Sequence, residues 1–143
     1  MKCEIIIDAM AEEKVIIYAK EKSAVIEAIK KLAEETSSEI LGFHGSEIIK
    51  LNPLDIECIS VINNKIYAFC GAEEYMLKER LCHLEEKLPD DFVKINQSCL
   101  GNIKKMERFD TSISGTLKIR FKNGHTDYVS RRQLKHIKER IGI

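Results

Sequence analysis

The residue types that most often carry catalysis are scattered along this sequence. Its four histidines form neither an H-x-x-x-H nor an H-E-x-x-H pattern, and they lie at His44, His83, His125 and His136. The chain also has no G-x-S-x-G elbow and no glycine-rich phosphate loop. Its acidic pairs are typical of solvated faces. We therefore expect a protein that is not an enzyme and that needs no cofactor or metal ion.

Cysteine is the second residue type that could do chemistry here. The five cysteines are odd in number, widely spaced and without a C-x-x-C pair, and they are Cys3, Cys58, Cys70, Cys82 and Cys99. This pattern favours reduced thiols in a core over a disulfide framework or a zinc module. A redox-sensing cysteine is the alternative.

Charge is divided unevenly between the two parts of the chain, although the formal net charge is +0. Residues 92–143 hold 12 Lys and Arg against 4 Asp and Glu, which gives +8, whereas residues 1–91 hold 11 against 19, which gives −8. A basic half of this kind is the electrostatic footprint of a polyanion-binding protein. The alternative is a dipolar protein whose halves attract each other or a second copy.

Length and composition indicate an ordinary globular protein. The 143 residues suit one compact domain, or one domain with a small appended unit, and 44% of them are hydrophobic. No apolar run approaches the roughly 18–20 residues of a membrane span. The apolar run before Asp8 is only three residues long, too short for a signal peptide. We expect a cytoplasmic protein.

The N-terminal residues predict a strand–strand–helix unit. Residues 3–8 and 14–19 contain β-branched runs, and an acidic turn separates these two expected strands. Ser23 is a candidate N-cap, and helical periodicity then predicts a helix from about Ser23 to Glu35. The apolar face of this helix must be covered, either by the rest of the chain or by self-association.

The remaining residues favour short strands with few helices. Strands are expected at 41–43, 47–51, 55–62, 65–70, 73–77, 92–95, 116–122 and 125–129, and residues 100–106 are ambiguous. Asn63-Asn64 and Asn123-Gly124 predict tight hairpins. Leucines from Leu77 to Leu88 follow one helical face, and a basic helix is expected at 131–140. The boundary between the two units lies between Ser37 and Gly45.

Separated motifs follow one another in a fixed order over the C-terminal two thirds of the chain. The first motif is an L-x-x-L-E-E-K-L-P stretch at 81–89, and it is followed by F-x-K-I-x-x-S at 92–98 and by Asn102. Further along, the Asn-Gly hairpin at 123–124 is followed by V-S-R-R at 129–132. In residue type, order and spacing these motifs resemble the LytTR family of DNA-binding domains, over roughly residues 42–143. The sequence departs from the family at Gly101, where relatives carry a branched residue and where glycine would loosen the backbone by up to roughly 1 kcal/mol. It also departs at Gln97, which is often basic in relatives.

Together, the N-terminal pattern and this resemblance predict an α+β protein. The N-terminal unit at 1–40 would serve dimerisation or packing, and residues 41–143 would form the DNA-binding domain. The domain would be a mostly β, elongated stack of antiparallel sheets with short helices. Its loops would enter successive major grooves of duplex DNA and bend it. The base-reading positions that carry over are Asn64, Gln97 and Arg132. Their chemistry suits that role, because arginine pairs bidentately with guanine, and asparagine or glutamine with adenine.

Contacts to DNA phosphates would position the protein without selecting a sequence. The candidates are basic or hydroxyl side chains around the same motifs, and they are Lys65, Lys94, Ser98, Lys104, Lys105, Lys122, Ser130, Arg131 and Lys135. Lys118 and Arg120 alternate outward on their expected strand and are not assigned a contact.

The resulting hypothesis is a short, stand-alone, bacterial-type transcription regulator that binds double-stranded DNA as a homodimer at tandem or palindromic sites. The N-terminal unit of about 40 residues is too short for the receiver domain that often precedes a LytTR domain. The competing hypothesis is a protein-interaction adaptor, in which the acidic half binds a partner and the basic half is merely solvated.

Overall fold

The computed structural model describes residues 2–11, 14–37 and 39–143, and its first element is the expected N-terminal helix. Helix α1 spans Ala24–Ser37. The Ser23 hydroxyl accepts a hydrogen bond from the Ile26 amide at 3.4 Å, and its carbonyl accepts one from the Glu27 amide at 3.1 Å. These bonds confirm Ser23 as the N-cap, because a serine oxygen can satisfy an amide in the first turn.

The two N-terminal strands expected at 3–8 and 14–19 are wrong for this structure. The described residues 2–11 and 14–22 contain no strand, although a turn forms at residues 8–11. In that turn the Met10 amide donates to the Asp8 carboxylate at 3.0 Å and the Ala11 amide donates to the Asp8 carbonyl at 3.1 Å. The other residues of the expected acidic turn, 12 and 13, lie outside the described residues. Two short β-branched arms make a marginal hairpin when no third strand or packed helix supports them.

A seven-stranded antiparallel sheet forms the larger part of the body, with strand order β2-β1-β5-β4-β3-β7-β6. Its strands are β1 (Ile40–His44), β2 (Glu47–Leu51), β3 (Cys58–Ile62), β4 (Lys65–Cys70), β5 (Glu73–Leu77), β6 (Phe92–Asn96) and β7 (Cys99–Asn102). Each of these corresponds to an expected strand except β7, which lies mainly in the ambiguous stretch. The expected strand at 55–62 starts three residues late, because Pro53–Asp55 form a 3-10 turn (η1).

A three-stranded sheet with order β10-β9-β8 packs against this body. Its strands are β8 (Met106–Asp110), β9 (Lys118–Phe121) and β10 (Thr126–Tyr128), and a second 3-10 turn, η2 (Ile103–Lys105), precedes β8. The predicted alternation around β9 is confirmed, because Leu117, Ile119 and Phe121 are all fully buried. The sequence did not predict β8, whose residues are mostly exposed.

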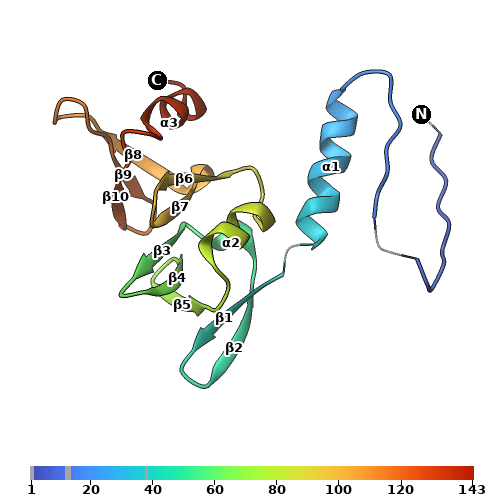
Figure 1. Cartoon of the computed structure of the whole chain (residues 1–143), viewed down its shortest axis with the longest axis horizontal. Helices are drawn as coiled ribbons and strands as arrows, with labels where there is room; N and C mark the ends of the chain where they lie inside the picture. The colour runs from blue at the N-terminus through green and yellow to red at the C-terminus, as the bar shows by residue number, and fades with distance from the viewer. Residues whose placement is uncertain (1, 12–13, 38) are drawn as a thin grey trace.

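Two short helices complete the body. Helix α2 spans Leu81–Lys87 and α3 spans Leu134–Ile141. The predicted leucine face is split between elements, since Leu77 ends β5 and is buried beside Leu84 and Leu88 in one core. Figure 1 shows both sheets, α2 and α3 gathered in one body, with α1 and the preceding segment to one side. The molecule is therefore α+β, mostly antiparallel sheet with three short helices.

Two hydrophobic cores lie on opposite faces of the central strands. Along β3 and β7, alternate residues enter different cores, so that Ile59 and Leu100 face α2 while Cys58 and Cys99 face the small sheet. This double burial explains why these strands are short apolar runs. Because both faces of these strands are covered by cores, only the turns at the strand ends are available to a binding partner.

Candidate nucleic-acid interface

The first candidate loop is the two-residue turn between β3 and β4. Asn63 and Asn64 have φ values of 51° and 62°, and the register pairs Ile62 with Lys65 on either side. Left-handed backbone at both central positions defines a type I′ turn, which confirms the tight hairpin that the sequence predicted. The side chains of Asn64 and Lys65 are exposed at its tip.

The second candidate loop is the turn between β6 and β7, which holds Gln97 and Ser98. The Ser98 amide donates to the side-chain oxygen of Asn96 at 2.8 Å, and the Ser98 carbonyl accepts from the Val61 amide at 2.8 Å. The second bond places this turn beside the end of β3, next to the Asn63-Asn64 turn. Gln97 and Asn64 therefore lie at the same end of the large sheet, and both are exposed.

The third candidate loop follows β10 and contains Ser130, Arg131 and Arg132. The Ser130 amide donates to the Ile95 carbonyl at 2.8 Å, which fixes this loop against β6. The Gln133 amide donates to the Ser130 carbonyl at 3.0 Å and closes the turn that leads into α3. Arg131 and Arg132 are exposed.

The structure thus brings the three predicted base-reading residues to one edge of the molecule. We call this edge, made of residues 63–64, 97–98 and 130–132, the loop row. Its order follows the strand order, with β7 and β6 lying between the first turn and the third loop. Because neighbouring strands are about 4.8 Å apart, the row extends over roughly 10–15 Å.

Asn96 ties the loop row together and was missed by sequence reasoning. Its side-chain amide donates to the Asp127 carboxylate at 3.0 Å and to the Tyr128 carbonyl at 2.9 Å, while its side-chain oxygen accepts from the Ser98 amide. One residue thereby holds the second turn against the strand that leads to the third loop. The N-x-S spacing of Asn96 and Ser98 is a recognisable Asx-turn signal. Its link to Asp127, 31 residues away, appears only in three dimensions.

The predicted phosphate contacts divide into two groups. Lys65, Ser98, Ser130 and Arg131 belong to the loop row or adjoin it, and Ser130 is half-buried while the other three are exposed. Lys94 lies in mid-strand on β6 and lines an open hollow of about 460 Å³ with Gln133 and Arg140 of the α3 region. Lys135 is exposed on α3.

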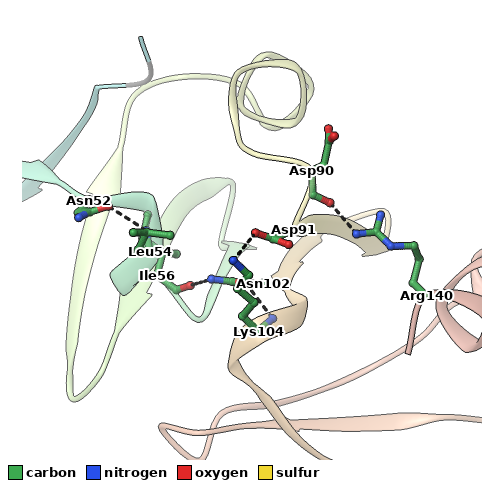
Figure 2. A network of polar contacts seen from close by, with 8 residues as sticks. All are labelled: Asn52, Leu54, Ile56, Asp90, Asp91, Asn102, Lys104 and Arg140. Atoms are coloured by element: carbon green, nitrogen blue, oxygen red, sulfur yellow. Dashed lines mark hydrogen bonds and ion pairs between the residues drawn. The ribbon is translucent and has the colours of Figure 1, made fainter. Parts of the chain in front are cut away.

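The other three lysines lie at the opposite ends of the strands. The Lys122 amide donates to the Lys105 carbonyl at 2.9 Å, and the Lys104 ammonium pairs with Asp91 at 3.2 Å. Figure 2 shows Lys104 in contact with both Asp91, which directly precedes β6, and Asn102, which ends β7. A five-residue strand separates this end from the loop row by roughly 13 Å.

Comparison with known families decides the identity of the domain. The model of the LytTr DNA-binding domain matches residues 46–142 of this chain. The chain belongs to the LytTR family. This is a family of DNA-binding domains and not of enzymes, and its match covers every residue of the loop row.

Two staphylococcal proteins that match this chain over its full length are described as transcriptional regulators. Two proteins of Staphylococcus aureus, from strains MSSA476 and NCTC 8325, are each 32% identical over 148 residues, which covers 100% of this chain and 99% of theirs. Both are described as uncharacterized HTH-type transcriptional regulators. In the described part of this chain, by contrast, strands separate each helix from the next, so no helix-turn-helix is seen there.

A solved structure supports the fold. The LytTr DNA-binding domain of a Bacillus cereus protein, named as a methyl-accepting/DNA response regulator, matches with a TM-score of 0.69 and 18% identity. The match covers 74% of this chain and 98% of that one. The body of this chain therefore has the LytTR fold.

Two family-motif positions have structural roles in this LytTR domain. The buried Asn102 donates from its side-chain amide to the Ile56 carbonyl at 3.0 Å and accepts from the Lys104 amide at 3.1 Å (Figure 2). Gly101 is buried, and a Cβ at this position would lie 2.9 Å from the Phe121 ring. The Phe121 ring therefore occupies the space that a branched residue would need, and packing around Gly101 is tight rather than loose.

The outward face of the small sheet carries arginines that sequence reasoning did not single out as a pair. Arg108 on β8 is the register partner of Arg120 on β9, and both are exposed. Within residues 2–11, 14–37 and 39–143, no ion pair joins either guanidinium to a carboxylate. Like charges directly opposite each other are destabilising in a sheet. This face adds to the positive charge of the C-terminal half.

Two buried cysteines and a half-buried histidine form a polar cluster between the large sheet and the small sheet. Cys58 and Cys99 are fully buried, and the Ser60 hydroxyl donates to the Cys99 sulfur at 3.3 Å. The hydrogen bond from Cys99 is the main cause that lowers the pKa of the Cys58 thiol to about 6, and His125 lowers it further. The same interaction with Cys58 raises the pKa of His125 above its ordinary value.

The expectation of reduced core thiols holds for only part of the set. All five cysteines are free, but Cys3 and Cys82 are exposed.

Among the residues that the structure describes, no group of three or more His, Cys, Asp or Glu side chains is arranged to hold a metal ion. In the same residues, no helix has the length and apolar character needed to cross a membrane.

Proposed function

We propose that this LytTR protein is a sequence-specific transcriptional regulator that reads duplex DNA in the major groove through the loop row. The observation that carries the proposal is that Asn64, Gln97 and Arg132, which are 33 and 35 residues apart in sequence, are all exposed at one edge of the molecule. Arg132 can donate two hydrogen bonds to guanine O6 and N7, and the two amides can pair with adenine N6 and N7.

The surrounding side chains suit contacts to the DNA backbone. Lys65, Ser98, Ser130 and Arg131 lie in or beside the loop row, so they can reach phosphates on either side of the bases. Lys94 and Lys135 can add contacts from β6 and α3. We leave Lys104, Lys105 and Lys122 outside this contact, since they lie at the other end of the strands and Lys104 pairs with Asp91.

The backbone of the loop row favours precise placement of its side chains. Hydrogen bonds from Val61 to Ser98, from Ser130 to Ile95 and from Asn96 to the Tyr128 carbonyl link the three loops to neighbouring strands. Sites built on rigid elements keep their geometry better than free loops.

We propose that the protein acts as a homodimer, because two linked domains on paired half-sites bind with a much higher effective affinity.

The experiment that tests this function is selection of bound duplexes from a random pool, followed by affinity measurements on the selected site between 50 and 200 mM salt. We expect a defined site, and affinity that falls by orders of magnitude over this salt range if about six phosphates are contacted. The variant Lys65→Gln/Arg131→Gln should reduce the slope of log affinity against log salt by roughly 2, whereas Lys122→Gln should leave it unchanged.

The same experiment separates this function from the adaptor hypothesis. An adaptor with a merely solvated basic half would select no sequence and would not be retained on DNA at 50 mM salt. Equal slope changes for the double variant and for Lys122→Gln would show that the basic residues act through net charge and not through the loop row.

A further inference from the structure

The N-terminal residues leave a large amount of apolar surface uncovered. Within residues 2–11 and 14–22, seven large apolar side chains are at least 60% exposed, and they are Ile5, Ile6, Ile7, Met10, Val15, Ile16 and Tyr18. On α1, Val25 is 56% exposed and Leu32 is 65% exposed. Soluble proteins rarely leave contiguous apolar surface of this extent open to water, and such patches mark interaction sites.

The body of the LytTR domain does not need these side chains. Both hydrophobic cores are closed without any residue that precedes Ile40. The family match begins at residue 46, and the matched Bacillus cereus domain covers 74% of this chain. In Figure 1, α1 and the extended segment before it stand apart from both sheets. The staphylococcal relatives, however, match over the full length, so this unit accompanies the domain in them.

The form of the unit indicates an incomplete sheet. Residues 5–7 and 15–17 are β-branched triplets, the residue type that favours strands, and a hydrogen-bonded turn at Asp8 follows the first arm. No described residue of either arm is paired in a strand. A sheet of three or more strands, with a helix on one face, is needed for independent stability. One copy of the chain supplies only two arms and one helix.

We propose that residues 2–37 form a dimerisation unit in which the two β-branched arms of each chain pair with those of a second copy. The product is a four-stranded intermolecular sheet covered by two α1 helices. The inference rests on the proposed function in one respect, since it assigns a surface to the homodimer proposed above.

Area and charge support a second copy as the partner. Partial burial of these seven exposed side chains would remove several hundred Å² per protomer, which approaches the roughly 800 Å² per partner of a standard protein–protein interface. Residues 2–37 hold 6 Lys against 8 Asp and Glu, so two such units repel each other little. A strongly charged partner is not favoured by this balance. Two arms from each of two identical chains also give four strands, which exceeds the three that an independently stable sheet needs.

The test is the mass of the full chain in solution by sedimentation equilibrium, without DNA. We expect a dimer for the wild type and a monomer for Ile6→Glu/Ile16→Glu, because a charge on each arm cannot be buried in the sheet. Ile48→Glu is the matched control, since Ile48 is 65% exposed on β2, outside the unit, and this variant should remain dimeric. A monomeric wild type, or an arm variant that stays dimeric, would overturn the inference.

Hydrogen exchange of the same samples adds a second measurement. Amides at 3–8 and 14–19 should gain protection as the wild type dimerises, and amides of the body should be unaffected by the arm substitutions. Protected arm amides in a monomer would instead mean that the arms fold back on their own body, which also overturns the inference.

DNA binding separates failure of this inference from failure of the proposed function. The monomeric arm variant should bind a single half-site as tightly as the wild type, and should lose at least tenfold in affinity on a paired site. If neither protein selects a half-site while only the wild type is dimeric, the DNA-reading proposal fails and the dimerisation unit stands. If both bind alike on paired sites and both are dimeric, the dimerisation unit fails.

Discussion

The side-chain amide of Asn96 donates a hydrogen bond to the carboxylate of Asp127 at 3.0 Å, across 31 residues of sequence. Asp127 lies on β10, three residues before Ser130 in the third loop. Asn96 lies directly before Gln97. This pair therefore sets the position of the second turn relative to the third loop, which carries the two arginines of the loop row.

Substitution of Asn96 tests that link. Asn96→Ala removes the bonds to Asp127, to the Tyr128 carbonyl and to the Ser98 amide, and should lower the free energy of unfolding by about 1–2 kcal/mol. It should also lower specific DNA affinity at least several-fold, because Gln97 and Arg132 lose their fixed spacing. Asn52→Ala is the control, since Asn52 makes a comparable turn bond to the Leu54 amide far from the loop row. Equal DNA affinity for the two variants would refute the positioning role.

Arg132 is the residue expected to contribute most to base selection. Arg132→Ala should weaken binding to the selected site by roughly 1–3 kcal/mol, through loss of a bidentate contact to guanine, and should change binding to random DNA much less. Arg80→Ala is a matched control, since Arg80 is exposed before α2 and makes no side-chain cap bond there. A gel-shift titration of folded proteins measures both. Parallel losses on specific and random DNA would assign Arg132 to a phosphate.

The buried Cys58–His125 contact predicts a measurable pH dependence. Because Cys58 raises the pKa of His125, Cys58→Ala should lower the histidine pKa, which NMR of the ring protons can follow. The stabilisation from protonated His125 is complete below the ordinary histidine pKa of about 6.5, and it is lost as pH rises through the raised pKa of the folded state. Cys82→Ala changes only an exposed thiol and should leave the His125 titration where it is.

Gly101 is expected to be intolerant of larger residues. Gly101→Val should lower the free energy of unfolding by about 1–3 kcal/mol, because a Cβ would lie 2.9 Å from Phe121 and 3.0 Å from Met106. Combination with Phe121→Leu should recover part of that loss, since the smaller side chain leaves room for the branched one. Denaturant unfolding of the single and double variants measures the coupling. If the losses in free energy of unfolding of the two single variants simply add in the double variant, the Phe121 side chain is not what excludes a larger residue at position 101.

Local features of this protein were predictable because neighbouring residues decide them. The Asn63-Asn64 pair specifies its own left-handed turn, Ser23 caps α1, and the alternation of Leu117, Ile119 and Phe121 sets the inward face around β9. The order of the LytTR motifs likewise identified the domain, and with it the residue types at the loop row.

Features that depend on a partner distant in sequence were not predictable in the same way. The two N-terminal arms have the composition of strands, yet they form none in the described residues, because a strand exists only through the hydrogen bonds of a neighbour. Sequence order placed Lys104, Lys105 and Lys122 with the other basic candidates, but chain reversal carries them to the far end of the strands.

The sequence by itself therefore determined which turns, helices and family this protein has, and which side chains are suited to reading bases. Only the tertiary structure decided that Asn64, Gln97 and Arg132 share one edge, that Asn96 connects two of their loops, and that Gly101 is fully packed. The physical reason is range: turn and cap preferences act within a few residues, whereas strand pairing and core packing join residues whose separation along the chain carries no local signal.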